Sequence, residues 1–590
     1  MTRIRLWSTG SRKSIESAPL WHWVRDHRTA ILLGIILFHA VNTLVVVSLD
    51  RIPLFGDEAL HFSKSGAMYH SIRELDAGKF LSSLGWKYPP LHRLLSLPFF
   101  FLLGYHPDVA VWSTLLPTVV LILSMYHIGS ELGEEPTGIL AAAITVLLPS
   151  VFGFSRTYFQ EPTLMAATTL TLALMIKSRG FERKGFTFAF GLSIGLGLLV
   201  KWTYTLFVLG AILFYLFRSA KKLIRAGARS DEIWKRVRRL LLAVGLGLLL
   251  ASAWYIPNLG NVYRYILQLR LEDTARVGLG GTLFYQMDGR NPLFVLRYMY
   301  QPVIIFTELL GPFFSLVSLA SLVYLAIERK GEVWFPLAWF VFPLVVLAAT
   351  FSNHPIARPV MAYSPAFALI IALGFTALPS RLRGPAILML LLTGLAQYLI
   401  VTYSSAAENP LAGYPSPRDT RGLSTFDRRS WKLIEMTETL NALIGDDPSA
   451  RVLVLDHLFY TGPVLKYLQF ANQLHPVNIS EGAGGEPCIF AEDGCPRSVE
   501  RHLELMRQVN IVVKGDGGRP PGEEYPGKDD YINMVQAWNL TRDEFIPIRS
   551  IEFPDGQRVT IYARESLLGG ENLTPLSSEG PGDSIRTTKA

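Results

Sequence analysis

The sequence predicts a polytopic α-helical membrane protein with a small soluble domain at its C-terminal end. Only 18% of the 590 residues are charged, whereas soluble globular proteins carry about 25%. Half of the residues are hydrophobic, and the mean hydropathy is +0.29. The polar residues are concentrated after about residue 404, so the first two-thirds of the chain is strongly apolar. This distribution excludes a disordered protein, a coiled coil and an ordinary series of soluble domains.

The charge balance and the cysteines exclude further classes. The net charge is +8, and a basic surplus can indicate nucleic-acid binding. In a membrane protein, basic cytoplasmic loops are the commoner explanation, so we predict no nucleic-acid partner. The two cysteines, Cys488 and Cys495, exclude a disulfide-rich scaffold and a cysteine-based zinc site.

The apolar segments predict about eleven membrane spans. Each span needs about 20 apolar residues. The segment 91–104 is apolar but short, which favours a re-entrant or interfacial helix. The first apolar run is long and lacks a small-residue cleavage site, so we expect it to remain as a span. The predicted spans are 30–49, 109–128, 137–153, 159–177, 186–200, 202–217, 240–257, 302–327, 333–351, 359–379 and 385–403.

The basic residues predict the orientation of these spans, because Lys and Arg are retained in cytoplasmic loops. Basic clusters occur in the N-terminal tail 1–29 and in the segments 177–184 and 218–239, all on one side of the predicted membrane. The segment 129–136 is acidic, but acidic residues carry little weight in this rule. The opposite, extracytoplasmic side then receives the segments 50–90, 154–161, 258–301 and everything from 404 onward.

Two adjacent carboxylates, Asp57 and Glu58, follow the first span at the outer boundary. A carboxylate at this depth carries a large free-energy cost of desolvation unless it is hydrated or paired, so it is often functional. A helix N-cap is the structural alternative for the pair. His61 lies four residues after Asp57 and could share a helix face with it as a metal pair, but we prefer an interfacial aromatic role. The stretch to about Phe80 is amphipathic and should lie in the interface.

Further polar groups gather at the same predicted boundary. Lys87 precedes Tyr88 and a double proline, and it either holds a phosphate or anchors the loop at the interface. Helix capping is the structural alternative for Glu161, but capping does not explain why Arg156 occurs in the same short turn. The remaining bases of this boundary are Lys201, His354 and Arg358.

Taken together, these acids and bases converge on one membrane face. An acid that acts as a general base, next to cations that hold a phosphate, suits transfer from a lipid-phosphate donor. The polyprenyl tail of such a donor would lie between helices, with its phosphate at the outer boundary.

The order and spacing of these motifs resemble those of the integral-membrane GT-C glycosyltransferases over residues 30–403. The similar branch contains the protein O-mannosyltransferases and the aminoarabinose transferase of lipid A. Gly56-Asp57-Glu58-Ala59 is similar to the acidic motif of the first outer loop. The other matching segments are KYPPL (87–91), MYHIGSELGEEPTGILAAAITVLLPS (125–150), FSRTYFQEPTLMAATTLTLAL (154–174), GLGLLVKWT (195–203) and HPIARPVMAYSPAFALIIA (354–372).

This resemblance implies a GT-C fold and a set of roles. Asp57 would be the catalytic base that deprotonates or orients the acceptor hydroxyl, Glu58 would support the site, and Glu161 would contact acceptor or donor. The family implies an inverting transfer from a polyprenyl-phosphate sugar. No nucleotide cofactor is expected, and the sequence contains no Gly-rich nucleotide loop; a divalent metal is left open. Lys87, Lys201, His354 and Arg358 would contact the donor phosphate. Arg156, Tyr88 and His61 would be candidates to support the site.

The C-terminal region predicts a small extracytoplasmic α/β domain at 430–570, after a linker at 404–429 and before a disordered tail at 571–590. We expect a helix at 430–444, strands at 451–455 and 510–513, and a strand pair between Glu544 and Arg564 that turns at residues 554–556. Because this compartment permits disulfides, we predict that Cys488 pairs with Cys495.

We therefore predict a glycosyltransferase of the cell membrane, with the N-terminus in the cytoplasm. Its partners would be the bilayer, a polyprenyl-phosphate-linked sugar and a lipid, protein or glycan acceptor. The alternative is a polytopic transporter or lipid flippase, which should place ionisable groups near the bilayer midplane and show two related halves. A scaffold without enzymatic activity would leave the clustered acids unexplained.

Overall fold

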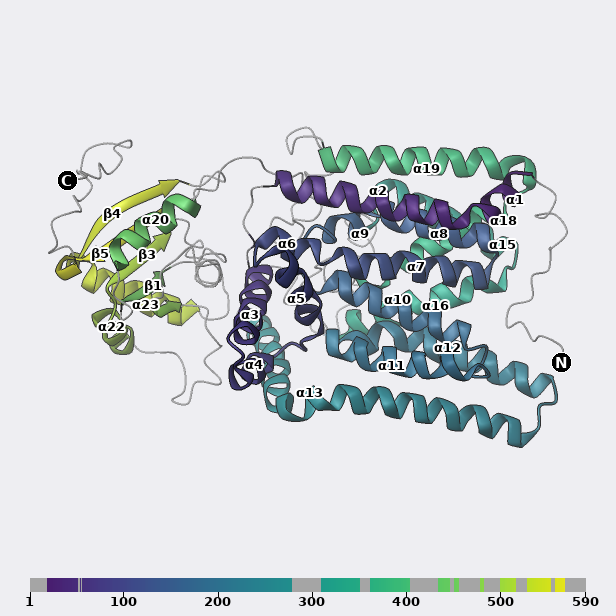
Figure 1. Ribbon diagram of the computed structural model, residues 1–590, viewed down its shortest axis with the longest axis horizontal. Helices are drawn as coiled ribbons and strands as arrows, with labels where there is room; N and C mark the ends of the chain where they lie inside the picture. The colour runs from purple at the N-terminus through teal and green to yellow at the C-terminus, as the bar shows by residue number, and fades with distance from the viewer. Residues whose placement is uncertain are drawn as a thin grey trace.

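The computed structural model describes residues 19–50, 54, 56–278, 309–350, 361–403, 433–445, 450–455, 478–481, 499–515, 528–552 and 558–567. These residues form a bundle of long helices and, after it, a domain built on a five-stranded sheet (Figure 1). The predicted class, a polytopic helical membrane protein with a small sheet in its C-terminal region, is confirmed.

The bundle helices run along a common direction (Figure 1). Four segments are long and apolar enough to cross a membrane by length and composition: Arg28–Leu49, Pro107–Leu132, Ser230–Leu267 and Ser380–Tyr403. Shorter apolar helices complete the bundle. The helices are α1 (Pro19–Asp26), α2 (Arg28–Leu49), α7 (Leu115–Leu132), α8 (Glu135–Leu147), α9 (Pro149–Phe154), α10 (Glu161–Lys177), α11 (Lys184–Val200), α12 (Tyr204–Arg225), α13 (Ser230–Gly278), α15 (Gly311–Ile327), α16 (Trp334–Thr350), α18 (Pro365–Ala377) and α19 (Ser380–Tyr403).

The burial pattern separates central helices from peripheral ones. Most residues of α8, α10 and α18 are buried, as expected for helices that are apolar on all sides. The peripheral helices α2, α13 and α19 instead expose large aliphatic side chains, among them Leu37 at 64%, Leu249 at 69% and Leu388 at 60%. A soluble monomer rarely exposes so much contiguous apolar surface, whereas a lipid-facing surface requires it.

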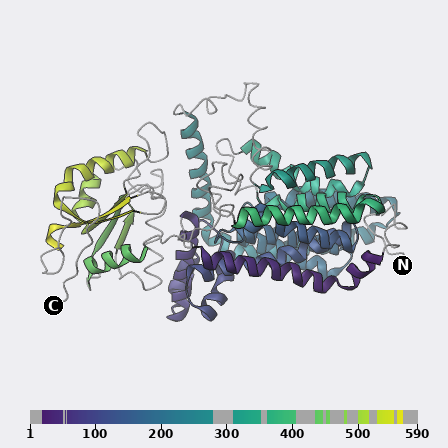
Figure 2. The same cartoon turned by 90° about the horizontal axis from the view of Figure 1, so that it is seen from above.

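Four shorter helices lie at one end of the bundle: α3 (Gly56–Arg73), α4 (Ala77–Leu84), α5 (Leu91–Leu103) and α6 (Pro107–Trp112) (Figures 1 and 2). The short apolar segment at 91–104, predicted as a re-entrant or interfacial helix, forms α5. The amphipathic stretch before it is divided into two helices. Leu75 has a left-handed backbone at φ 56°, and the Asp76 carboxylate caps α4 by accepting a hydrogen bond from the Lys79 amide at 2.9 Å.

The helices α11 and α13 approach each other closely because both carry glycines at their contact. A Cβ atom on Gly191 would fall on the carbonyl oxygen of Ala243, and one on Gly195 would fall on the carbonyl oxygen of Gly247. Small residues at such positions let the two helix backbones touch, which is how membrane helices gain packing contacts. This contact holds α13 against α11.

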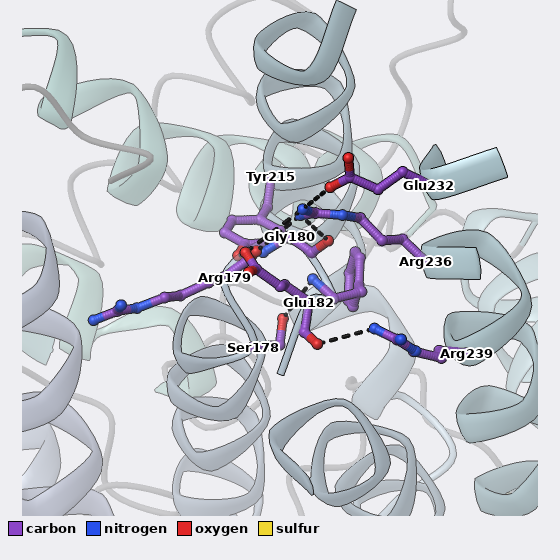
Figure 3. Close-up of polar contacts among 9 residues, drawn as sticks. Ser178, Arg179, Gly180, Glu182, Tyr215, Glu232, Arg236 and Arg239 are labelled. Atoms are coloured by element: carbon purple, nitrogen blue, oxygen red, sulfur yellow. Dashed lines mark hydrogen bonds and ion pairs between the residues drawn. The ribbon is translucent and has the colours of Figure 1, made fainter. Parts of the chain in front are cut away.

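The turn between α10 and α11 is held by polar contacts with neighbouring helices (Figure 3). Three successive residues have left-handed backbones, Arg179 at φ 52°, Gly180 at 67° and Phe181 at 64°. Two partners hold this unusual turn: the Tyr215 hydroxyl accepts a hydrogen bond from the Gly180 amide at 2.8 Å, and Arg236 of α13 donates to the carbonyl oxygens of Arg179 at 3.4 Å and Gly180 at 3.3 Å.

Charged side chains surround this turn. Arg236 pairs with Glu232 at 2.6 Å and with Glu182 at 3.5 Å, and Arg239 donates to the Glu182 carbonyl oxygen at 3.0 Å. The basic residues of the α12–α13 connection therefore lie at the end of the bundle opposite to α3–α6 (Figure 1).

The C-terminal sheet has the strand order β2-β1-β3-β5-β4. β1 pairs in parallel with β2 and β3, and β5 pairs antiparallel with β3 and β4. The predicted strand pair is β4 and β5, and β2 was not predicted. The elements are α20 (Leu433–Ile444), β1 (Arg451–Leu455), β2 (Asn478–Glu481), α22 (Val499–Arg507), β3 (Ile511–Gly515), α23 (Lys528–Thr541), β4 (Phe545–Glu552) and β5 (Arg558–Arg564).

Candidate functional site

The two adjacent acids of the first outer segment lie in the first turn of α3. The helix begins at Gly56, so Asp57 and Glu58 are inside the helix rather than at its cap position, and their charges complement the positive end of the helix dipole. Asp57 is half-buried, whereas Glu58 is only 1% exposed. One Glu58 carboxylate oxygen accepts a hydrogen bond from the Tyr158 backbone amide at 2.8 Å. Glu58 therefore fastens α3 to the turn that precedes α10.

Tyr158 connects this turn to two of the short helices at this end of the bundle, α3 and α5. Its side chain is fully buried, and its hydroxyl forms hydrogen bonds with Ser65 of α3 at 2.8 Å and Ser96 of α5 at 2.7 Å. Burial raises the pKa of Tyr158 to about 12, so the hydroxyl keeps its proton at neutral pH. The residue acts as a neutral crosslink between α3, α5 and the turn.

Glu161 and Lys201 form a buried ion pair. Glu161 is the first residue of α10, and Lys201 follows the last residue of α11 with an extended backbone. The Lys201 ammonium is 2.9 Å from a Glu161 carboxylate oxygen, and the side chains are 15% and 4% exposed respectively. Screening by water is weak at such burial, so the pair forms a local dipole at the boundary end of two helices.

His92 links the acids of α3 with this ion pair. Its Nδ1 is 2.9 Å from the Thr163 hydroxyl, two residues after Glu161 along α10. Its ring lies 4.7 Å from the ring of Tyr158. Because His92 belongs to the first turn of α5 and is 2% exposed, burial lowers its pKa to about 4. The imidazole is therefore neutral at physiological pH and serves as a polar bridge.

His61 belongs to an aromatic cluster. It is 3% exposed, and its ring lies 5.2 Å from Trp86, 5.5 Å from Tyr88 and 5.7 Å from His92. These contacts fit the aromatic interpretation of His61 better than a metal pair with Asp57. Within the described residues, no group of three or more His, Cys, Asp or Glu side chains is placed to hold a metal ion.

The segment 83–88 is held from two sides. On one side, the fully buried Arg93 of α5 donates hydrogen bonds to the Tyr88 carbonyl oxygen at 3.0 Å and to the Ser83 carbonyl oxygen at 3.4 Å. The Arg93 guanidinium also lies 4.9 Å from the Trp86 ring centroid. On the other side, α13 contacts the segment through Tyr265, whose ring centroid lies 4.5 Å from the Lys87 ammonium. The position of Lys87 is therefore set by an aromatic partner.

Arg156 lies in the turn that leads to Glu161, but it contacts a different helix. Its guanidinium donates to the Tyr398 hydroxyl at 2.8 Å and to the Thr402 hydroxyl at 3.1 Å, both on α19. The turn therefore presents its base to α19 and its acid to Lys201, which explains why both occur within six residues of sequence. Of the other predicted residues, His354, Arg358, Cys488 and Cys495 lie outside the described residues.

Sequence reasoning missed several members of this network. His92 and Arg93 are polar residues at the start of an apolar segment, and this placement was a signal that they are held in a buried environment. Tyr158 lies within a motif whose charged residues alone were considered. Thr163 carried no signal, because its role depends on a contact with His92 across 71 positions of sequence.

Comparison with known proteins supports the predicted resemblance. Residues 87–254 match the sequence model of the family described as dolichyl-phosphate-mannose-protein mannosyltransferase. This range includes Lys87, Glu161 and Lys201 and begins after α3. No curated protein matches the sequence.

Among solved structures, ArnT from Cupriavidus metallidurans in the apo state is 12% identical with a TM-score of 0.54, and the alignment covers 93% of this chain and 100% of that chain. ArnT bound to undecaprenyl phosphate gives 13% identity and a TM-score of 0.54, covering 92% and 99%. An oligosaccharyltransferase from Archaeoglobus fulgidus, in complex with Zn and sulfate, gives 13% identity and a TM-score of 0.48, covering 90% and 73%. The chain has the GT-C fold, and the predicted resemblance to GT-C glycosyltransferases is confirmed.

Proposed function

We propose that this GT-C chain is an inverting glycosyltransferase that moves a sugar from a polyprenyl-phosphate donor to an acceptor at the extracytoplasmic face. The observation that carries the proposal is the linked set of polar groups at one end of the bundle. Glu58 is joined through Tyr158 and His92 to Thr163, next to the Glu161–Lys201 pair. The family match and the similar structures are those of glycosyltransferases.

Asp57 is the proposed base of the transfer. It takes the proton of the acceptor hydroxyl while the acceptor oxygen forms a bond to the anomeric carbon. The bond between that carbon and the phosphate oxygen breaks, and its electron pair leaves with the polyprenyl phosphate. Because attack and departure occur on opposite faces of the carbon, the anomeric configuration inverts. Glu58 supports Asp57 by holding the start of α3 in place.

The cations of the boundary stabilise the departing phosphate. Positive groups that are already in position before the reaction favour negative charge as it develops on the leaving group. Lys87 and Lys201 supply this charge from the described residues, with Glu161 orienting Lys201. His354 and Arg358 remain proposed contributors, and Tyr88, His61 and Arg156 remain proposed support. We propose no required cofactor.

Three arguments support a polyprenyl-phosphate donor and a site on the extracytoplasmic side of the membrane. ArnT is solved with undecaprenyl phosphate bound, and by analogy this chain would take a polyprenyl-phosphate sugar. The basic α12–α13 connection lies opposite to the site, which indicates that the site end faces away from the cytoplasm. The domain proposed at 430–570 follows α19 and would share that side. The acceptor is a glycolipid, a protein or an envelope glycan.

Replacement of Asp57 tests the proposal. Asp57→Asn keeps the shape of the side chain and removes the proton acceptor, so we expect sugar transfer to fall by about 10²- to 10⁴-fold. The assay is transfer by the purified full-length protein in nanodiscs, with polyprenyl-phosphate sugars prepared from the native membrane. Glu74→Gln is the matched control, because Glu74 is an exposed acid at the end of the same helix region. Normal turnover by Asp57→Asn would refute the base role.

A transporter would need its ionisable groups in a different place from a glycosyltransferase. They would lie near the middle of the membrane, between broken helices. Asp57, Glu161 and Lys201 instead lie at helix ends. No observation among the described residues favours transport, so the glycosyltransferase remains our proposal.

A further inference from the structure

The outer half of α13 forms one wall of the segment that carries Lys87. α13 contains Pro257, which removes a helical hydrogen bond and bends the helix, and Figures 1 and 2 show the helix changing direction at this end of the bundle. Around the bend, the Trp254 indole donates to the Leu84 carbonyl oxygen at 2.9 Å. About three turns further along, the Tyr265 hydroxyl is 2.8 Å from the Tyr88 hydroxyl.

Between these two contacts, the ring of Tyr265 faces Lys87. The Lys87 ammonium is 4.5 Å from the Tyr265 ring centroid and 5.7 Å from the Tyr88 ring centroid. Both distances are within the range of cation–π attraction. Two aromatic rings from different parts of the chain therefore define where the ammonium lies.

The charge of Lys87 differs from that of Lys201 in one important respect. The charge of Lys201 is partly balanced by Glu161, whose carboxylate oxygen lies 2.9 Å from the ammonium. Within the part of the chain that the structure describes, no carboxylate lies within ion-pair distance of Lys87. An aromatic ring attracts a cation through its quadrupole and leaves its net charge in place. Lys87 is therefore positioned but still fully charged toward an incoming anion.

We propose that Tyr265 is a positioning residue for the donor phosphate, acting through Lys87. Its ring holds the ammonium in the orientation that meets the phosphate, so the long lysine side chain loses less rotamer freedom when the donor binds. The inference rests on the proposed function, because it takes Lys87 as one of the two lysines that contact the donor phosphate, alongside the Lys201 that is paired with Glu161. It makes α13, whose bundle half packs on α11, part of donor recognition.

The test measures binding of undecaprenyl phosphate to the full-length protein in nanodiscs. Tyr265→Leu removes the ring, and we expect the dissociation constant to rise about 2- to 10-fold. Tyr265→Phe keeps the ring and should stay close to the wild type. Tyr263→Leu is the matched control, because Tyr263 is on the same helix with 64% exposure.

A double-mutant cycle separates positioning from a general structural role. Tyr265→Leu should cause no further loss in the Lys87→Met background. Phenylalanine analogues with increasing ring fluorination at position 265 keep the shape while weakening the ring quadrupole, so affinity should decline step by step. This series remains informative if the leucine variant fails to fold.

Several outcomes would overturn the inference. They are an unchanged affinity for Tyr265→Leu, a loss in Tyr265→Phe as large as in Tyr265→Leu, a flat fluorination series, or an equal loss in the Lys87→Met background. If Lys87→Met itself binds undecaprenyl phosphate normally, the phosphate role of Lys87 in the proposed function fails as well. A loss for Lys87→Met without any loss for Tyr265→Leu overturns the inference alone.

Discussion

Glu161 and Lys201 show how strongly single polar residues are constrained at this end of the bundle. Both side chains are buried, and each compensates the charge of the other across 2.9 Å. Removing one member of such a pair leaves a poorly hydrated charge, whereas removing both together costs much less. The pair is therefore expected to matter for folding in addition to its proposed contact with substrate.

Lys201→Met should lower the free energy of unfolding by about 3–5 kcal/mol. The double variant Glu161→Gln/Lys201→Met should recover most of this loss. Unfolding by titration with SDS, followed by circular dichroism, measures both, and Lys201→Arg serves as the charge-preserving control. Equal losses in the single and double variants would show that the ion pair does not carry the effect.

His92 predicts a dependence of stability on pH. Its pKa is about 4 in the folded protein because of burial, against about 6.5 in the unfolded chain. Below pH 6.5, the His92 imidazole therefore binds a proton in the unfolded chain but stays neutral in the folded protein until the pH approaches 4. The stabilisation is fully present above pH 6.5 and is lost as the pH falls toward 4.

We expect wild-type protein to lose about 2 kcal/mol more stability than His92→Gln between pH 7 and pH 5. Glutamine keeps a polar contact with Thr163 and does not titrate. Unfolding curves at the two pH values give the comparison directly. Parallel losses in both proteins would mean that His92 is protonated in the folded state.

At the scale of the helix, the contact between α11 and α13 depends on glycines that have no Cβ. The two helices meet backbone to backbone at Gly195 and Gly247, and a methyl group there would collide with a carbonyl oxygen. Because α13 also carries Tyr265, a shift of α13 would move the aromatic ring that contacts Lys87.

Gly195→Ala should therefore destabilise the protein by about 1–3 kcal/mol through overpacking. The matched control is Gly245→Ala on α13, where an added Cβ meets no atom within 4 Å. This control should be neutral or stabilise by up to about 1 kcal/mol, because alanine favours the helix. SDS unfolding of both variants tests the difference, and equal stabilities would contradict the close contact.

Much of the helical framework was predictable because long apolar runs have few other solutions in a bilayer. The breaks inside two runs were harder. The span predicted at 109–128 is interrupted after Trp112, where the Thr114 hydroxyl bonds the Ser155 carbonyl oxygen at 2.6 Å. The span predicted at 137–153 is interrupted at Leu148, before Pro149, and proline disfavours helix at the preceding residue. Only the second break had a local signal.

The site was predictable by residue type but not by partner. Acids and bases at span ends are unusual enough to be noticed in a sequence. Their partners come from distant positions, such as Glu58 with Tyr158 across 100 residues and Glu161 with Lys201 across 40. The strand β2 (Asn478–Glu481) was missed because four residues with only one apolar side chain show no alternation.

For the whole molecule, the two ends of the bundle have opposite chemical character. One end carries the linked polar network of α3, α5 and α10, and the other carries the clamped turn at Arg179–Phe181 with the basic α12–α13 connection (Figures 1 and 3). The positive-inside rule then predicts that the first end faces away from the cytoplasm.

Cysteine labelling in intact cells tests this orientation. In a background with Cys488 and Cys495 replaced by serine, Leu75→Cys should react with a membrane-impermeant maleimide, because Leu75 is 90% exposed at the site end. Ala226→Cys, after α12, should react only once the membrane is permeabilised. The reverse pattern would place the site on the cytoplasmic face.

Arg93 has a consequence for how the protein is made. It is completely buried, and among the described residues no carboxylate pairs with it; carbonyl oxygens of Ser83 and Tyr88 and the Trp86 ring surround it. While the chain leaves the ribosome, an arginine in the hydrocarbon would cost about 2.5–3.5 kcal/mol. We therefore expect stable packing of α5 to depend on the carbonyl oxygens that residues 83–88 supply to Arg93. A change in the segment 83–88 would then act on the insertion of α5 as well as on the site, because it would leave the Arg93 guanidinium buried without its acceptors.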